Sequence, residues 1–129
     1  GYVSPFYGIK HEAPVLRFAR RAAAACFHTV LYPYKSARPE IWVEEIPVFA
    51  QGKRCAESEA AALCITVTKE GKVSRDYYFT AHGDGGREYS FADFKFSGKL
   101  LLVRQDEHGN TIFSHQEPTT HVPRTRNSN

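Results

Sequence analysis

The sequence predicts an all-β chain, an antiparallel β-sandwich or curved sheet of about eight strands. Short alternating or apolar runs recur along it, separated by turn residues at spacings of roughly 8–12 residues. Nine Phe and seven Tyr add a high aromatic content, which favours strands. No segment keeps the apolar period of an amphipathic helix over a normal helix length. With 129 residues, the chain is long enough for a single domain with its own core.

The N-terminal third is predicted to be extended. Residues 1–14 contain two Pro and two Gly, which indicates an ordered loop or an extended arm. Residues 15–20 alternate with a period of two, which predicts a strand. Residues 24–32 are predicted as a second strand, because their alanine run is short and β-branched and aromatic residues follow it at once. Pro33 ends this strand, and residues 34–39 turn the chain.

The rest of the chain reads as strands joined by tight turns. A strand is expected at residues 41–49, where Pro47 indicates an edge position or a bulge. Polar residues 51–58 predict a loop. The later strands are expected at residues 59–68, 73–81, 89–96, 100–104 and 111–115.

Glycines and a change of parity define the connections between these strands. Glu70-Gly71 predicts a hairpin turn, and residues 82–86 a glycine-rich turn. The apolar alternation flips at Ala92-Asp93, which predicts a β-bulge. Gly109 is available for a positive φ in the last hairpin. Residues 118–129 are polar and proline-punctuated, and we expect a flexible tail.

Charge and cysteine content exclude several classes of protein. The net charge of +3 permits a polyanionic partner, but the basic clusters lack interleaved aromatics, so we expect no nucleic-acid binding. No apolar run reaches the length of a membrane span. The three Cys form no CxxC pair, which argues against a zinc ribbon. Cys26 and Cys64 lie in strand-like runs and favour buried thiols, although one disulfide with a free thiol also fits.

Three segments, in order, resemble one family of enzymes. The opening GYVSPFYGIKHEAPVL, the central FHTVLYPYKSARPEI and the late FADFKFSGKLLLVRQDEHGN are similar to the C-terminal β-sandwich region of heparinase II/III-like polysaccharide lyases. Tyr2 stands where the family pattern has Trp, and Ser97 stands where it has an acidic residue. The sequence contains no Met, so we expect a single domain, residues 1–129, excised from a larger lyase.

The resemblance implies a parent enzyme of known type. Such lyases combine a helical toroid with β-sheets and cleave uronate-containing polysaccharides, glycosaminoglycans among them, by β-elimination. A base removes the proton next to the uronate carboxylate, and an acid protonates the leaving oxygen. The expected partners are therefore the toroid domain and an acidic polysaccharide, in the periplasm or outside a bacterial cell. The family's catalytic residues and its structural metal match no position in this chain, so no catalytic residue, metal ligand or cofactor is assigned.

The residues themselves offer candidate contacts to a sugar. Aromatic rings and cations together suit an acidic glycan, through stacking and charge-assisted hydrogen bonds. The same residues would also suit a corner in which the rings pack together and the charges remain in water. The alternative function of the chain is a carbohydrate-binding module, or a scaffold domain without glycan binding. The candidates are Tyr7 and His11 in the first loop, and Tyr34, Lys35, Arg38 and Trp42 around the central corner.

Overall fold

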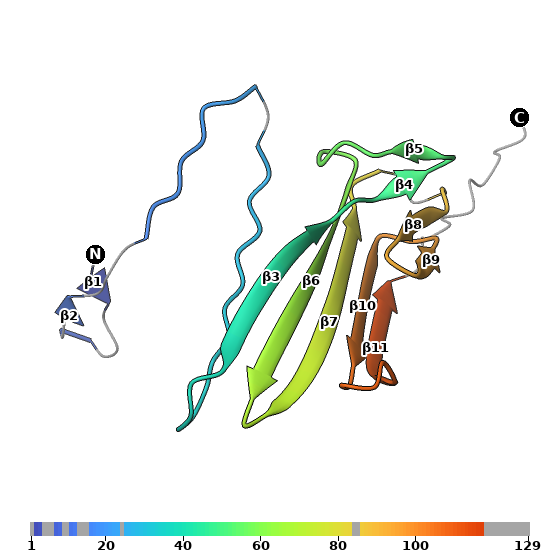
Figure 1. The fold of residues 1–129 in the computed structure, drawn as a ribbon. Helices are drawn as coiled ribbons and strands as arrows, with labels where there is room; N and C mark the ends of the chain where they lie inside the picture. The colour runs from blue at the N-terminus through green and yellow to red at the C-terminus, as the bar shows by residue number, and fades with distance from the viewer. Residues whose placement is uncertain are drawn as a thin grey trace, which may run out of the picture.

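The computed structural model describes residues 2–3, 7–8, 11–12, 16–23, 25–83 and 86–117. All regular structure in these ranges is β-strand, which confirms the predicted all-β class (Figure 1). The strands form a five-stranded sheet, a four-stranded sheet and the short pair β1–β2, all antiparallel. The part of the chain that is described contains no helix long and apolar enough to cross a membrane.

The five-stranded sheet forms the larger layer, and its strand order is β11-β10-β7-β6-β3. The order of the smaller sheet is β5-β4-β8-β9. The bounds are β1 Tyr2–Val3, β2 His11–Glu12, β3 Glu40–Ile46, β4 Phe49–Ala50, β5 Lys53–Arg54, β6 Ala60–Lys69, β7 Lys72–Ala81, β8 Tyr89–Phe91, β9 Phe94–Phe96, β10 Leu100–Gln105 and β11 Thr111–Glu117.

One face of the large sheet packs against the small sheet and forms the core. The pairing places Ala62, Phe79 and Leu101 side by side on this face. Phe79 is fully buried, and its ring stacks on that of Phe91 from β8 with centroids 4.7 Å apart and planes 5° from parallel. Tyr89, also from β8, lies against Phe79 at 5.2 Å. These aromatic contacts join the two sheets, so the predicted strand-favouring rings are also the main core.

The opposite face of the large sheet is also apolar at its centre. Strand alternation places Leu63, Ile65, Tyr78 and Leu102 there. Residues 27–31 run across this face and line a pocket together with these four side chains. An antiparallel sheet usually has one face exposed to solvent. An apolar second face therefore indicates that both faces of this sheet are covered.

The predicted strands at residues 15–20 and 24–32 are wrong as far as the described residues show. Residues 16–20 and 25–32 are assigned to no strand. A strand needs a neighbour to share its hydrogen bonds, and no backbone bond joins these segments to another described backbone group. The period-two alternation in these two segments indicates an extended backbone, but not one that shares hydrogen bonds with a neighbouring strand. Val15 and Ala24 lie outside the described residues.

Three further differences involve strands of the small sheet. The predicted strand 41–49 is two strands, because the chain leaves β3 after Ile46 and resumes as β4 beyond Pro47, and β3 is an edge strand. The bulge predicted at Ala92-Asp93 is instead the two-residue turn of the β8–β9 hairpin, in which Ala92 has a φ of 46°. The loop predicted at residues 51–58 contains the short strand β5.

The hairpin turns and the thiols are set by local chemistry. The β6–β7 turn is Glu70-Gly71, as predicted, with both residues at positive φ. Gly109 has a φ of 80° in the β10–β11 connection, also as predicted. All three cysteines are free: Cys64 is buried, but Cys26 is only half-buried, contrary to expectation. The tail predicted at residues 118–129 lies outside the described residues.

Candidate functional site

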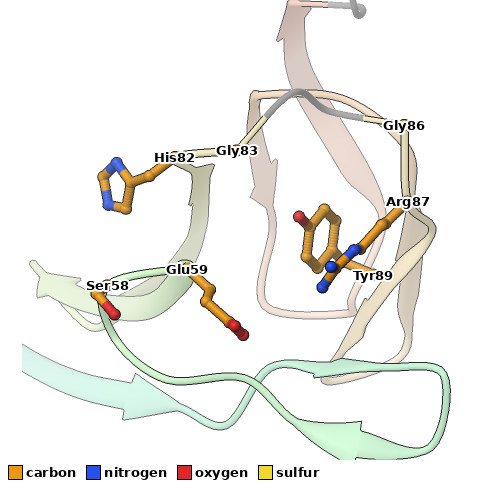
Figure 2. A pocket seen from close by; sticks show the side chains of 7 residues that line it. All are labelled: Ser58, Glu59, His82, Gly83, Gly86, Arg87 and Tyr89. Atoms are coloured by element: carbon orange, nitrogen blue, oxygen red, sulfur yellow. The ribbon is translucent and has the colours of Figure 1, made fainter.

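An open pocket lies at one end of the molecule, where the two sheets meet (Figure 2). Three connections contribute to it: the turn before β6, the end of β7 and the approach to β8. The lining residues are Ser58, Glu59, His82, Gly83, Gly86, Arg87 and Tyr89. This pocket brings together a carboxylate, a guanidinium, an imidazole and a phenol from separate parts of the chain.

Backbone hydrogen bonds hold the rim of this pocket in place. The N–H of His82 donates to the carbonyl of Glu59 at 2.9 Å, which ties the end of β7 to the start of β6. The N–H of Glu59 donates in turn to the carbonyl of Ala56. Tyr89 is anchored in β8, where it pairs with Ala50 of β4, and its side chain is buried in the core. The backbone of Glu59 is therefore hydrogen-bonded through both its N–H and its carbonyl.

The charges of Glu59 and Arg87 face the same opening. Figure 2 shows the two side chains reaching in from opposite sides, whereas the His82 imidazole points away. Burial raises the pKa of the nearby Cys55 thiol, Glu59 raises it further, and Arg87 lowers it. No ion pair between Glu59 and Arg87 occurs in the structure. A guanidinium and a carboxylate left open in this way suit a ligand that carries both an acidic group and hydroxyls.

The residues predicted around the central corner are separated by the structure into two groups. Tyr34 and Arg38 line one shallow pocket, together with Val30, Tyr32, Pro39, Ile41 and Val43. Lys35 is exposed on the bend beside it. A phenol ring next to a guanidinium and an ammonium is the grouping that the sequence suggested for an acidic sugar.

Trp42 belongs to the other face of β3. Successive side chains of a strand alternate, so Trp42 points away from Ile41 and Val43, which line the pocket of Tyr34 and Arg38. Its ring is 67% exposed, and Glu40 and Glu44 flank it on its own face. Two carboxylates beside the ring disfavour a polyanion there. Trp42 and Arg38 therefore cannot contact the same sugar from one side of the sheet.

The first-loop candidates lie near the β1–β2 pair. Tyr7 is in the turn between these strands, fully exposed. His11 begins β2, and its side chain lies outside the described part of the structure. Tyr7 is not among the residues that line the pocket of Tyr34 and Arg38.

Cys26 and His28 are a pair of neighbouring side chains that could take part in metal or thiol chemistry. Cys26 Sγ lies 3.5 Å from His28 Nε2, as expected for neighbours on one side of an extended segment. No group of three or more potential ligands occurs among the described residues. A stable zinc site takes four ligands, or three with a water, so the pair alone does not make one.

The pocket with Glu59 and Arg87 was missed by sequence reasoning. Its signal was the glycine-rich turn at residues 82–86, which lies beside it and was interpreted only as a turn. No family model, curated protein or solved structure matches this chain.

Proposed function

We propose that this chain is the non-catalytic β domain of a heparinase II/III-like lyase, which cleaves uronate-containing polysaccharide by β-elimination. Its role is to support a helical toroid domain and to form part of a substrate cleft. The observation that carries the proposal is the exposure of large apolar side chains along residues 25–34. Leu31 is 87% exposed there, and Phe27 and Tyr34 are more than half exposed.

The geometry of this segment explains why a covering domain is expected. Its residues 27–31 lie against the apolar face of the large sheet, next to Leu63 and Leu102. Phe27 and Leu31 line that pocket and still remain largely in water, although apolar groups gain about 25 cal/mol for each Å² that is buried. A row of exposed apolar side chains on an extended segment is typical of a docking surface. A toroid seated there would cover both the segment and the sheet beneath it.

The acidic substrate would meet this domain at the pocket of Tyr34 and Arg38. The pocket adjoins the proposed docking surface, because Val30 and Tyr32 line it as well. Lys35 adds a second cation at its edge. The face of Trp42 is disfavoured by Glu40 and Glu44. The pocket of Tyr34 and Arg38 would thus form a wall of the cleft.

The test compares this chain alone with a longer polypeptide that also carries the helical domain. Both are incubated with alginate, hyaluronate, heparin and neutral dextran, and unsaturated uronate ends are followed by ultraviolet absorbance. We expect activity on an acidic polymer from the longer polypeptide and none from the chain alone. Leu31→Asp should lower that activity by weakening docking, whereas Phe49→Asp, at an exposed apolar residue of β4 in the small sheet, should not. The proposal would be refuted if the longer polypeptide contained no helical domain.

A second candidate function, a carbohydrate-binding module, is favoured by the pocket with Glu59 and Arg87. Calorimetric titration of the chain with the same polysaccharides tests it, with Arg87→Ala and Arg38→Ala as paired variants. Loss of binding only in Arg87→Ala would assign recognition to the pocket of Figure 2. Loss only in Arg38→Ala would assign it to the corner. Absence of binding by the chain would leave a scaffold role without glycan contact.

A further inference from the structure

Residues 16–21 form an extended arm whose backbone lacks partners. They belong to no strand, and no hydrogen bond joins them to another described backbone group. Their side chains are all exposed, with Leu16 at 83% and Phe18 at 71%. Three of the six are arginines, Arg17, Arg20 and Arg21. An extended, apolar and basic segment of this kind is suited to pair with the open edge of a sheet.

Strand β3 is an open edge of the large sheet. It pairs with β6 on one side and, among the described residues, with no strand on the other, so alternate N–H and C=O groups face outward. Three of its seven residues are carboxylates, Glu40, Glu44 and Glu45, and all three are exposed. The other open edge, β11, carries a single carboxylate, Glu117. Charge complementarity therefore assigns the basic arm to β3.

We propose that residues 16–21 of one copy pair antiparallel with β3 of a second copy, and that the second copy does the same in return. One register matches the side chains on the face of Trp42. In it, Arg17 lies opposite Glu44, Ala19 opposite Trp42 and Arg21 opposite Glu40. On the other face, Phe18 lies opposite Val43. Opposite charges in such cross-strand positions stabilise a sheet, and a small residue leaves room for the indole.

The arm of the same copy is placed less well for this contact. Residues 25–34 connect it to the bend before β3, and in Figure 1 they run between residues 16–21 and the sheet. Residues 27–31 of that connection lie on the apolar face of the sheet, where they contact side chains of β6 and β10. Exchange of the arms between two copies satisfies both edges, and it closes as a two-fold dimer with no open contact left over.

Sedimentation equilibrium on the chain, over a range of concentrations, measures the dimer. We expect a concentration-dependent dimer that Arg17→Glu/Arg21→Glu weakens by roughly tenfold or more, because two attractive pairs become repulsive in each of the two arm–edge contacts. Glu40→Arg/Glu44→Arg should weaken it equally. Lys53→Glu/Arg54→Glu, on the exposed strand β5, is the control for the arm variant. It changes the net charge by the same amount as Arg17→Glu/Arg21→Glu and should leave the dimer intact.

Mixing the two reversed variants gives the decisive result. Each arm then meets an edge of opposite charge in both directions, so a heterodimer should form at the original affinity. Misfolded variants would not recover in this way, and circular dichroism of each variant alone checks its fold. A monomer at all concentrations, a dimer that ignores both reversals, or no recovery on mixing would overturn the arm exchange. The dimer is expected whether or not the chain belongs to a lyase, so its failure leaves the proposed function standing.

Discussion

Arg104 of β10 and Asp76 of β7 lie directly opposite each other and are joined by two hydrogen bonds of 2.7 Å. The guanidinium donates through Nε and one terminal nitrogen to the two carboxylate oxygens, a fork geometry that only Arg supplies. The hydrogen bond to Asp76 raises the pKa of Arg104. The pair lies on the sheet face crossed by residues 27–31, and it fixes the register of two central strands there.

Arg104→Lys is expected to lower the free energy of unfolding by up to about 1 kcal/mol, because Lys keeps the charge but loses the second hydrogen bond. The side chain of Arg104 is 47% exposed and that of Asp76 is 14% exposed, so solvent weakens the pair and a larger loss is not expected. Urea unfolding of Arg104→Lys, Asp76→Asn and the double variant measures the coupling. Strictly additive losses would show that the two hydrogen bonds contribute nothing to stability.

Local signals predicted the β6–β7 hairpin well, but they missed the β8–β9 hairpin. Glu70-Gly71 has a turn chemistry that determines its own geometry, and the alternation on both sides of it determines which residues face the core. The extended arm could not be predicted in the same way. Its alternation is as regular as that of a strand, but a strand depends on a neighbour, and no described segment pairs with residues 16–21.

The candidate site was partly predictable. Tyr34 and Arg38 are close in sequence and share a pocket, as the aromatic and basic corner suggested. The position of Trp42 follows from alternation along β3, which separates it from that pocket. Glu59 and Arg87 meet only because the long β6–β7 hairpin and the following turn return the chain to its starting point. That relationship is tertiary: the local glycines indicate a turn, but they do not indicate which side chains the turn brings together.

Gly98→Ala should destabilise the fold, since the glycine is buried close to the ring of Phe96 and the backbone of Glu117. A Cβ there would lie 2.5 Å from Cζ of Phe96 and 2.8 Å from the carbonyl oxygen of Glu117. The ring of Phe96 packs edge-on against Phe79, so it has little room to move. We expect a loss of about 1–3 kcal/mol, the usual cost of overpacking. Thermal and urea unfolding measure the loss.

Gly86→Ala is the matched control for this substitution. A Cβ at Gly86 would meet nothing within 4 Å, and its backbone does not occupy the positive-φ region. Its stability should therefore stay within about 0.5 kcal/mol of the parent chain. Backbone entropy alone favours Ala over Gly, so equal losses in the two variants would contradict the packing explanation for Gly98.

Asp106 should make the β10–β11 hairpin sensitive to acid. Its carboxylate accepts hydrogen bonds from the backbone N–H groups of His108 and Asn110 at 2.9 Å, and from the Asn110 side-chain amide at 3.2 Å. These contacts, the backbone bond from Asn110 first, lower the pKa of Asp106 below its ordinary value of 3.8. A lowered pKa in the folded state stabilises the fold at pH values above 3.8, and this stability is lost as the pH falls through the folded pKa.

Asp106→Asn separates this titration from the hydrogen bonds themselves. The amide oxygen of Asn can still accept from the two backbone N–H groups, but it carries no charge to protonate. Between pH 5 and roughly pH 2, the thermal midpoint of the parent chain should therefore fall more steeply than that of Asp106→Asn. Asp93→Asn, at an exposed position in the β8–β9 turn, serves as the control and should follow the parent chain. If Asp106→Asn and the parent chain fell in parallel, the hairpin carboxylate would not be a source of the acid sensitivity.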